Sequence, residues 1–148
     1  MFSSILLCLV VGVSDGDTLK ARCGQPGAYE QVTVRLAEID APEKSQPFGQ
    51  RSKEHLSGLC FGKQAKIRPS TRDRYGRTVA RVTCAGADAN VEQVSAGMAW
   101  AYTRYQTDPK FTQHEQQARA TRAGLWRDAK PVAPWEWRAD RRQARQRS

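Results

Sequence analysis

Strand-like segments in the first third of the chain limit its fold more than any other feature of the sequence. The segment LVVGVS runs into the turn SDGD, and TLKARC leads back out of that turn. The Asp15–Gly16 pair is a strong hairpin signal, because such pairs accept the positive backbone angles of a two-residue turn. The sequence therefore predicts an antiparallel hairpin at the start of the domain.

A third strand, QVTVRLAEID, carries a break in its alternation. Apolar side chains line one face of this segment, and Arg35 lies on the other face. The next large apolar residue is Ile39, so the alternation slips by one position around Ala37 and Glu38. A bulge or a strand end there would turn Asp40 toward the side that Arg35 occupies.

The rest of the chain predicts two more strands and three helices. The strands cover residues 63–68 and 78–84 and are joined by the polar loop PSTRDRYG. The apolar spacing predicts one helix that begins at about Gln50 and two more over residues 89–100 and 112–126. Gly97 is expected to end the second of these helices as a C-terminal cap. Five strands with one helix among them and two helices after them predict an α+β fold, a small barrel with helices packed against it.

The length and charge of the chain narrow the class of its partner. At 148 residues the chain fits one domain with a full-sized core. Lys and Arg outnumber Asp and Glu by 24 to 15, which gives a net charge of +9. This excess favours nucleic acid first and an anionic membrane surface second, over a basic protein with no polyanionic partner. A basic tail, residues 138–148, ends the chain and is expected to be frayed.

The N-terminal run MFSSILLCLVVGV is open to two interpretations. It has the length of the apolar part of an export signal, although no basic residue precedes it and no clear cleavage site follows it. It is shorter than the roughly 20 residues of a membrane span, and its second half also fits the first strand. We expect residues 1–10 to be a shortened export signal or the start of that strand, and residues 10–137 to be the folded domain of a secreted or periplasmic protein.

Cysteine usage bears on the same compartment. Cys8 lies in the apolar run, which leaves Cys23, Cys60 and Cys84 in the folded body, with no spacing typical of a zinc site. An exported protein would join two of these three in a disulfide, whereas a reducing compartment would leave buried free thiols. Cys60 ends the first predicted helix and Cys84 ends a strand, so these two are the expected pair and Cys23 is left over.

Three motifs, VSDGDTL, RLAEIDAPE and DRYGR, occur in an order and at intervals that resemble those of the staphylococcal nuclease (thermonuclease) family. The resemblance extends from about Val10 to Trp126, and the later segments NVEQVSAGMAWAY, RAGLW and PWEW are similar to the bacterial branch of that family. It implies a five-stranded OB-type β-barrel with three packed α-helices. It also implies a calcium-dependent, sugar-nonspecific nuclease that hydrolyses DNA and RNA to 3′-phosphate products.

Asp17 and Asp40 are candidate metal ligands. Both are hard oxygen donors at strand ends, which calcium accepts together with backbone carbonyls and water, although an aspartate in a DG turn is usually only a turn former. The resemblance implies that both bind the cation together with the backbone carbonyl of Ala41, at a position where the family usually has threonine. Asp15 matches an acid near the metal that orients ligands or water. Hard oxygen ligands alone do not separate Ca²⁺ from Mn²⁺.

Glu43, Arg35 and Arg77 are the candidate catalytic residues. Water that attacks a phosphodiester needs a group that positions or deprotonates it, and Glu43 could do either. An arginine fork pairs with two phosphate oxygens, which makes Arg35 and Arg77 candidate phosphate clamps. Structural alternatives remain, since Glu43 could favour a helix start and Arg35 could pair with Glu38. Arg77 could be one solvated arginine among several.

Aromatic side chains are candidates for nucleotide contact. The resemblance implies that Tyr75 and either Tyr102 or Tyr105 stack on or hydrogen-bond a nucleotide, and stacking on an aromatic ring tolerates any base. Packing in the core is the alternative for Tyr102 and Tyr105. His55 and His114 have no serine or cysteine partner typical of a triad, so we assign them no catalytic role.

Two other classes of protein fit parts of the pattern. A binding module that kept the barrel and lost catalysis would bind nucleic acid or protein, and a basic envelope protein would be anchored by its N-terminal run. One set of charged residues favours the nuclease, because a binding module has no reason to hold its members together. The set consists of Asp17, Arg35, Asp40, Glu43 and Arg77. The expected substrate is single-stranded or locally open DNA and RNA, and the expected state is a monomer with no stable protein partner.

Overall fold

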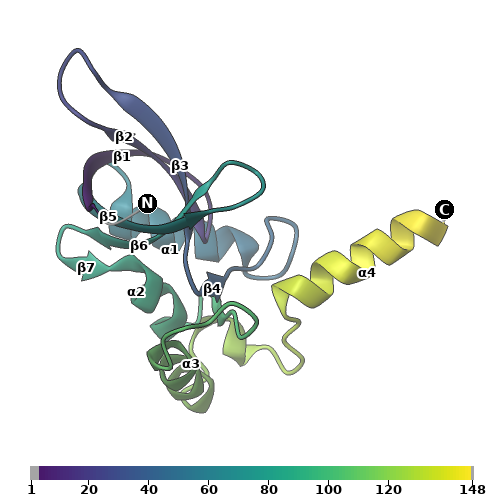
Figure 1. Cartoon of the computed structure of the whole chain (residues 1–148). Coiled ribbons are helices and arrows are strands. Elements are labelled where there is room, and N and C mark those ends of the chain that lie inside the picture. The colour runs from purple at the N-terminus through teal and green to yellow at the C-terminus, as the bar shows by residue number, and fades with distance from the viewer. Residues whose placement is uncertain (1–3, 148) are drawn as a thin grey trace.

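Five strands wrap around one apolar core and close into a barrel (Figure 1). The computed structural model describes residues 4–147. The barrel strands are β1 (Leu6–Asp15), β2 (Thr18–Cys23), β3 (Glu30–Leu36), β5 (Gln64–Arg72) and β6 (Thr78–Cys84). They follow the order β3-β2-β1-β5-β6, and a short parallel pairing between β3 and β6 closes the circle. The predicted α+β class and five-stranded barrel are confirmed.

Two smaller pairings extend the barrel. The short strand β7 (Ala87–Asp88) pairs with the end of β6. Strand β4 (Ile39–Asp40) pairs with β8 (Trp100–Ala101) in a separate two-stranded sheet, and thereby ties the RLAEID segment to the helical part of the chain.

Four α-helices and one 3-10 helix surround the barrel, one α-helix more than predicted. They are α1 (Gly49–Cys60), α2 (Ala89–Ser95), α3 (Lys110–Ala120), η1 (Gly124–Arg127) and α4 (Pro134–Arg147). Helix α4 extends away from the body of the molecule (Figure 1). The expectation of a frayed tail is therefore wrong for residues 138–147, which are helical. No helix within residues 4–147 is long and apolar enough to cross a membrane.

Two glycines end the later helices, α2 at the expected Gly97 and α3 earlier than predicted. Helix α2 ends at Ser95, and Gly97 follows with a φ of 71°. The backbones of Gly97 and Gly124 cross so closely that a Cβ on Gly97 would lie 2.1 Å from the carbonyl oxygen of Ala123. The amide of Leu125 donates to the Gly97 carbonyl at 2.9 Å. This crossing ends α2 before Trp100 and separates α3 from the 3-10 turn.

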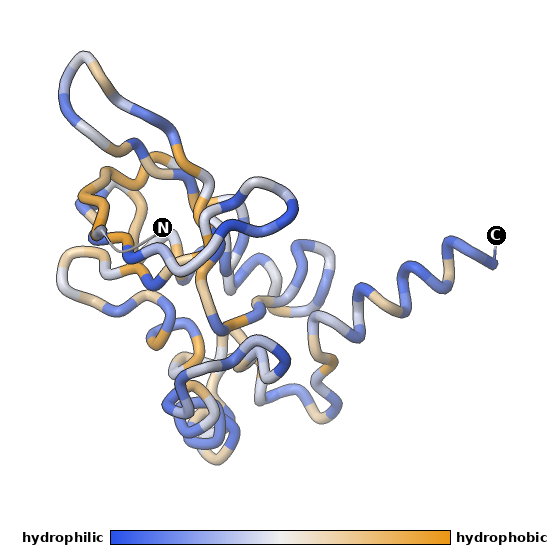
Figure 2. The backbone as a smooth tube through the Cα atoms, viewed as in Figure 1, coloured by the Kyte–Doolittle hydropathy of each residue, from blue (hydrophilic) through white to orange (hydrophobic). Residues whose placement is uncertain are grey.

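The core is apolar and is crossed by two disulfides. Figure 2 shows the hydrophobic residues concentrated on the barrel strands, whereas α4 is mostly hydrophilic. The fully buried side chains include Leu19, Leu36, Ile39, Leu56, Ile67 and Phe111.

The disulfides correct the cysteine prediction in part. Cys60 at the end of α1 is bonded to Cys84 at the end of β6, the pair expected from the sequence. Cys23 is not left over, because it is bonded to Cys8 across the β1–β2 hairpin. The sequence analysis set Cys8 aside with the apolar run, but β1 begins at Leu6, so Cys8 belongs to the barrel.

Candidate active site

The turn between β1 and β2 presents two aspartates. The Asp17 side chain is buried, and its Oδ2 atom accepts a hydrogen bond of 2.8 Å from the amide of Ala41. Thr18 Oγ1 donates to Asp17 Oδ1 at 3.0 Å, and the Asp17 amide donates to Asp15 Oδ1 at 3.1 Å. These bonds fix the carboxylate of Asp17 against the segment that follows Asp40.

The RLAEIDAPE segment supplies the facing charges. Strand β3 ends at Leu36, and the next residues turn through Glu38, which has a φ of 70°. Asp40 is almost fully buried after this turn. Arg35 Nη2 lies 3.3 Å from Asp40 Oδ1 and 3.5 Å from Asp17 Oδ2. The break in alternation thus does bring Asp40 to Arg35, and one guanidinium joins the two carboxylates.

Glu38 is not the partner of Arg35. Its Oε1 atom accepts hydrogen bonds from the amides of Thr107 at 2.6 Å and Asp108 at 2.5 Å. Its Oε2 atom lies 3.7 Å from Arg81 Nη1. Glu38 therefore anchors the loop before α3, and the structural pairing considered for Arg35 is wrong.

Burial and neighbouring charges set the protonation of the cluster. Burial, and next the charge of Asp17, raise the pKa of Asp15 to about 7. Burial also raises the pKa of Asp40 to about 6, although hydrogen bonds from Arg138 and the charge of Arg35 offset part of that effect. For Asp17, burial acts in the same direction, but the Arg35 charge and several hydrogen bonds outweigh it and hold the pKa below its usual value. Asp17 therefore carries the most persistent negative charge of the three.

Glu43 lies beside the cluster in the loop before α1. Its amide donates to Gln46 Oε1 at 3.1 Å, and its carbonyl accepts from the Gln46 amide at 2.9 Å. Its carboxylate is about one-third exposed and lies 3.6 Å, Oε1 to Nη1, from Arg138. Within residues 4–147 no other ion pair or hydrogen bond holds this side chain, so it is accessible to water and to a substrate.

Arg138 is a site residue that the sequence analysis missed. From α4, its Nη2 atom lies 2.7 Å from Asp40 Oδ2 and its Nη1 atom 3.2 Å from Asp40 Oδ1. The hydrogen bond to Asp40 outweighs the effect of burial and raises the pKa of Arg138, so the guanidinium stays charged. The sequence analysis assigned this arginine to a frayed tail, and the adjacent PWEW motif was the signal that the segment packs against the body.

Two buried amide side chains of α2 were also missed, although they hold the backbone of the site. Asn90 Nδ2 donates to the carbonyls of Ala37 at 3.0 Å and Ala80 at 3.1 Å. Gln93 Nε2 donates to the carbonyls of Gly16 at 2.7 Å and Ser52 at 3.1 Å. Both side chains are fully buried. Asn90 thereby supports the RLAEID segment, and Gln93 supports the aspartate turn.

Arg77 lies apart from the carboxylates, in the loop between β5 and β6. Its Nε atom pairs with Asp73 Oδ2 at 2.7 Å, and within residues 4–147 it forms no ion pair with Asp17 or Asp40. Its guanidinium lies 5.3 Å from the centre of the exposed Tyr75 ring. It directly precedes Thr78, which pairs with Val34 next to Arg35. Arg77 and Tyr75 also line a groove of about 570 Å³ between β3 and the β5–β6 loop.

Tyr102 packs against the start of α4, and Tyr105 lies beside Tyr102. The rings of Tyr102 and Tyr105 meet edge to face with centres 5.0 Å apart. Tyr102 also stacks on Trp135, with centres 5.3 Å apart and ring planes 2° apart. Tyr105 is exposed, whereas Tyr102 has one face covered. Tyr105 is therefore the more accessible of the two for a base.

The histidines make helix-to-helix contacts. His55 Nδ1 hydrogen-bonds the amide oxygen of Gln93, and His114 Nδ1 lies 3.1 Å from Ser95 Oγ. His114 therefore has a serine partner that the sequence analysis did not find, but within residues 4–147 no carboxylate contacts this histidine to complete a triad. His55 contacts only an amide.

The oxygen donors at the cluster fit a hard divalent cation. Asp17 and Asp40 face the same guanidinium nitrogen of Arg35, and carboxylates are the ligands that such cations prefer. In the part of the chain that the structure describes, no group of three or more His, Cys, Asp or Glu side chains could hold a metal ion. A cation here would therefore need further oxygens from a backbone carbonyl, such as that of Ala41, and from water.

Comparison with known proteins agrees with this geometry. A family model described as staphylococcal nuclease homologue matches residues 33–128. An uncharacterized endonuclease of Haemophilus influenzae is 48% identical over 131 residues, which cover 88% of this chain and 72% of the relative. An uncharacterized endonuclease of Escherichia coli is 40% identical over 144 residues, which cover 93% of this chain and 92% of the relative. A micrococcal nuclease of Shigella flexneri is 37% identical over 140 residues, which cover 87% of this chain and 78% of the relative. The family model matches more than half of the chain and these relatives are 37–48% identical to it, so the chain belongs to the staphylococcal nuclease family.

Proposed function

We propose that the chain is a metal-dependent phosphodiesterase that hydrolyses DNA and RNA. Its family and the nuclease names of its relatives support a hydrolase that acts on nucleic acids. The observation that carries the proposal is the meeting of Asp17 from the β1–β2 turn, Arg35 from β3 and Asp40 from β4. The Nη2 atom of Arg35 lies 3.5 Å from Asp17 Oδ2 and 3.3 Å from Asp40 Oδ1. The two carboxylates would bind a cation, and the arginine between them would bind a phosphate.

The residues divide the reaction among them. Glu43 accepts a proton from the attacking water, whose oxygen forms a bond to phosphorus as the bond to the 5′-oxygen breaks. Arg35 pairs with the phosphate oxygens, where charge grows in the transition state. Arg77, in the β5–β6 loop, releases its partner Asp73 and pairs with the same phosphate. Asp17, Asp40 and the Ala41 carbonyl would hold the cation, which when bound supplies positive charge to the phosphate and to water. The leaving 5′-oxygen takes a proton from solvent, and the phosphate stays on the 3′ side.

Finer features of the proposal rest on chemistry and on the family resemblance. Calcium is the proposed cation, because the donors are hard oxygens. The exposed rings of Tyr75 and Tyr105 favour a substrate with accessible bases, single-stranded or locally open, with no base preference. Two disulfides fit an oxidising compartment, so we propose a secreted or periplasmic protein. We propose that it acts as a monomer.

A cleavage assay tests the proposal directly. Plasmid and single-stranded DNA are incubated with the protein in Ca²⁺ or in EGTA, and RNA is treated in parallel. We expect both nucleic acids to be degraded in Ca²⁺ and to stay intact in EGTA, with 3′-phosphate ends on the products. Intact DNA in Ca²⁺ together with a persistent gel shift would instead support a binding module that has lost catalysis.

A further inference from the structure

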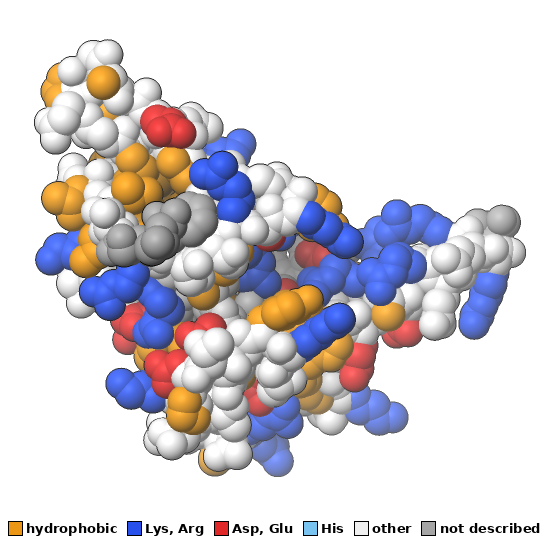
Figure 3. Space-filling view, viewed as in Figure 1, with side chains coloured by type: hydrophobic (Ala, Val, Ile, Leu, Met, Phe, Trp, Pro, Cys, Tyr) orange, Lys and Arg blue, Asp and Glu red, His pale blue; other side chains and the backbone are white. Residues whose placement is uncertain are grey.

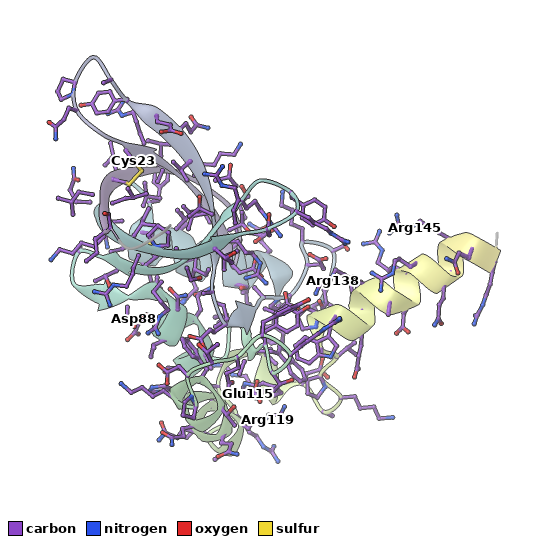
Figure 4. The ribbon with its side chains drawn as sticks, in the orientation of Figure 1. Cys23, Asp88, Glu115, Arg119, Arg138 and Arg145 are labelled. Atoms are coloured by element: carbon purple, nitrogen blue, oxygen red, sulfur yellow. A yellow bond between two sulfur atoms is a disulfide. The ribbon has the colours of Figure 1, made fainter. Side chains whose placement is uncertain are left out.

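Arg138 reaches the acidic cluster from a segment outside the family match. The match ends at residue 128, whereas α4 spans Pro134–Arg147. Arg138 holds both oxygens of Asp40, at 2.7 and 3.2 Å, and its Nη1 atom lies 3.6 Å from Glu43. Figure 4 shows Arg138 at the end of α4 next to the body of the molecule, with Arg145 farther out along the helix. Arg138 therefore places a second guanidinium beside that of Arg35 in the cluster.

Packing, and not only charge, places Arg138 there. Trp135 stacks on Tyr102 and meets Trp100 edge to face, with ring centres 5.5 Å apart. Gln46 Nε2 donates to the carbonyl of Val132 at 2.6 Å. The start of α4 is thus fixed against the loop that carries Glu43, and Arg138 follows within one helical turn.

Farther along α4, Arg141 Nη1 donates to Ser45 Oγ at 2.7 Å. The helix therefore runs beside the same loop for another turn. This second contact keeps the Arg138 side chain within reach of the site even when it releases Asp40.

The present partners of Arg138 are also those that a cation needs. Asp40 accepts hydrogen bonds from Arg138 on both oxygens, and one of these oxygens also faces Arg35. A cation that binds Asp40 must take an oxygen from Arg138, because like charges at this distance repel. Arg138 would then lie free beside the position of the substrate phosphate, and its planar fork suits two phosphate oxygens.

We propose that Arg138 is a phosphate-binding residue that pairs with Asp40 and Glu43 before a divalent cation binds and moves to the substrate phosphate afterwards. The inference rests on the proposed function, since it takes the phosphodiester and the cation as given. It assigns to α4 a part in the active site that the residues of the matched segment do not supply.

The first test measures Ca²⁺ affinity without nucleic acid. Isothermal titration calorimetry compares the full chain with Arg138→Gln and Arg138→Lys, and with Arg127→Gln as a control that removes an exposed arginine of η1. If Arg138 competes with the cation, Arg138→Gln should bind Ca²⁺ about fivefold more tightly or better, which is the ratio set by an ion pair of about 1 kcal/mol. Arg138→Lys and Arg127→Gln should remain close to the unchanged protein. Circular dichroism melting curves verify that each variant is folded.

The second test measures cleavage at saturating Ca²⁺. Arg138→Gln should lower kcat/KM by about 100-fold, the loss typical of one donor to a developing anion, and Arg138→Lys should restore part of it. Tighter cation binding combined with slower cleavage supports the inference, because a purely structural arginine would weaken both. Tighter binding with unchanged cleavage overturns it, since Arg138 would then only compete with the cation. Weaker or unchanged cation binding overturns it as well.

The two proposals fail in different ways. If the unchanged protein cleaves no nucleic acid with any divalent cation, the proposed nuclease activity falls. If that protein cleaves and Arg138→Gln cleaves equally well, only the role of Arg138 falls.

Discussion

Single carboxylates decide the chemistry of this site, and Glu43 is the clearest case. Its side chain is about one-third exposed, and within the described residues 4–147 it forms one ion pair, with Arg138. A residue with so few contacts contributes little to folding, so its replacement should report on catalysis. We expect Glu43→Gln to lower kcat by about 10²–10⁴-fold, the range of a general base, with an unchanged melting temperature. Single-turnover cleavage of an oligonucleotide measures this effect, and an unaltered rate would remove Glu43 from the mechanism.

Asp15 predicts a pH dependence of stability. Burial and Asp17 raise its pKa from 3.8 to about 7 in the folded protein. Between these values the folded state holds a proton that the unfolded state has lost, so this contribution to stability is complete below about pH 4 and disappears as the pH rises through 7. The free energy of unfolding of the unchanged protein, relative to Asp15→Asn, should therefore fall from pH 4 to pH 8. Urea unfolding of both proteins across this range measures it without added cation.

Asp73 supplies a control of opposite sign for that experiment. Although burial acts the other way, hydrogen bonds from the Arg77 amide and side chain lower the pKa of Asp73. Its contribution is present above the unfolded value of 3.8 and is lost as the pH falls through the folded value. The free energy of unfolding of the unchanged protein, relative to Asp73→Asn, should thus decrease as the pH is lowered. Parallel curves for the two variants would contradict both assignments.

At the scale of elements, α2 supports the backbone of the site through buried hydrogen bonds. Its Gln93 amide joins the carbonyl of Gly16, in the aspartate turn, to the carbonyl of Ser52 in α1. Gly16 packs so closely on α1 that a Cβ there would lie 1.7 Å from Ser52 Oγ. The position of Asp17 therefore depends on three elements that meet at one buried amide.

This arrangement predicts a joint loss of stability and activity. Gln93→Ala removes the side-chain donor of the buried Gly16 carbonyl, which should cost about 1–3 kcal/mol of unfolding free energy. Because the aspartate turn loosens, the affinity for Ca²⁺ should fall as well. Denaturant unfolding and calorimetry measure the two effects, and Gln116→Ala on the exposed surface of α3 is the matched control. A destabilised variant with unchanged Ca²⁺ affinity would show that Gln93 does not position the turn.

The elements also show what the sequence could and could not predict. Strand periodicity and the Asp15–Gly16 turn were enough for the barrel, and the slip at Glu38 was enough to bring Asp40 to Arg35. These signals are local. The contacts of Asn90 and Gln93 join segments far apart in the chain, and no periodicity marks which polar residue of a helix will be buried.

The same reason explains the errors at the C-terminus. The polar, arginine-rich composition of residues 138–147 indicated solvation, whereas the contacts that order this helix come from Trp135 on Tyr102 and from Gln46 on Val132. The PWEW motif indicated that the segment packs against the body, but its partners lie on other elements and only the fold identifies them. Gly97 ends α2 as expected, whereas the early end of α3 depends on the crossing of Gly124 with Gly97, which the local sequence does not reveal.

At the scale of the whole molecule, positive charge extends from the site along α4. Figure 3 shows Lys and Arg side chains on α4 and on the adjoining surface of the body. Beyond Arg138 the helix carries Arg141, Arg142, Arg145 and Arg147. A polyanion held at the cluster would meet this charge as it leaves the site.

Salt dependence tests this basic extension. Replacing the four arginines after Arg138 with glutamine should weaken binding evenly across sequences. It should also flatten the plot of log affinity against log salt by about 0.9 for each arginine that contacts a phosphate of duplex DNA, and by less on single strands. Fluorescence anisotropy in EGTA measures binding without cleavage. The paired variant Lys66→Gln and Arg68→Gln, on exposed positions of β5, is the control. An unchanged slope would place α4 outside the nucleic-acid path.

The parallel seam of the barrel links folding to chemistry. Only the pairs Val34–Thr78, Arg35–Val79 and Leu36–Ala80 join β3 to β6, and they unite distant stretches of the chain. Contacts of this kind form late, because the intervening loop must lose its freedom first. Arg35 belongs to this parallel pairing. A folding intermediate that has formed the hairpins but not this pairing would therefore not yet position Arg35 to bind phosphate. The time at which cleavage activity returns during refolding would then report when β3 pairs with β6 and the barrel closes.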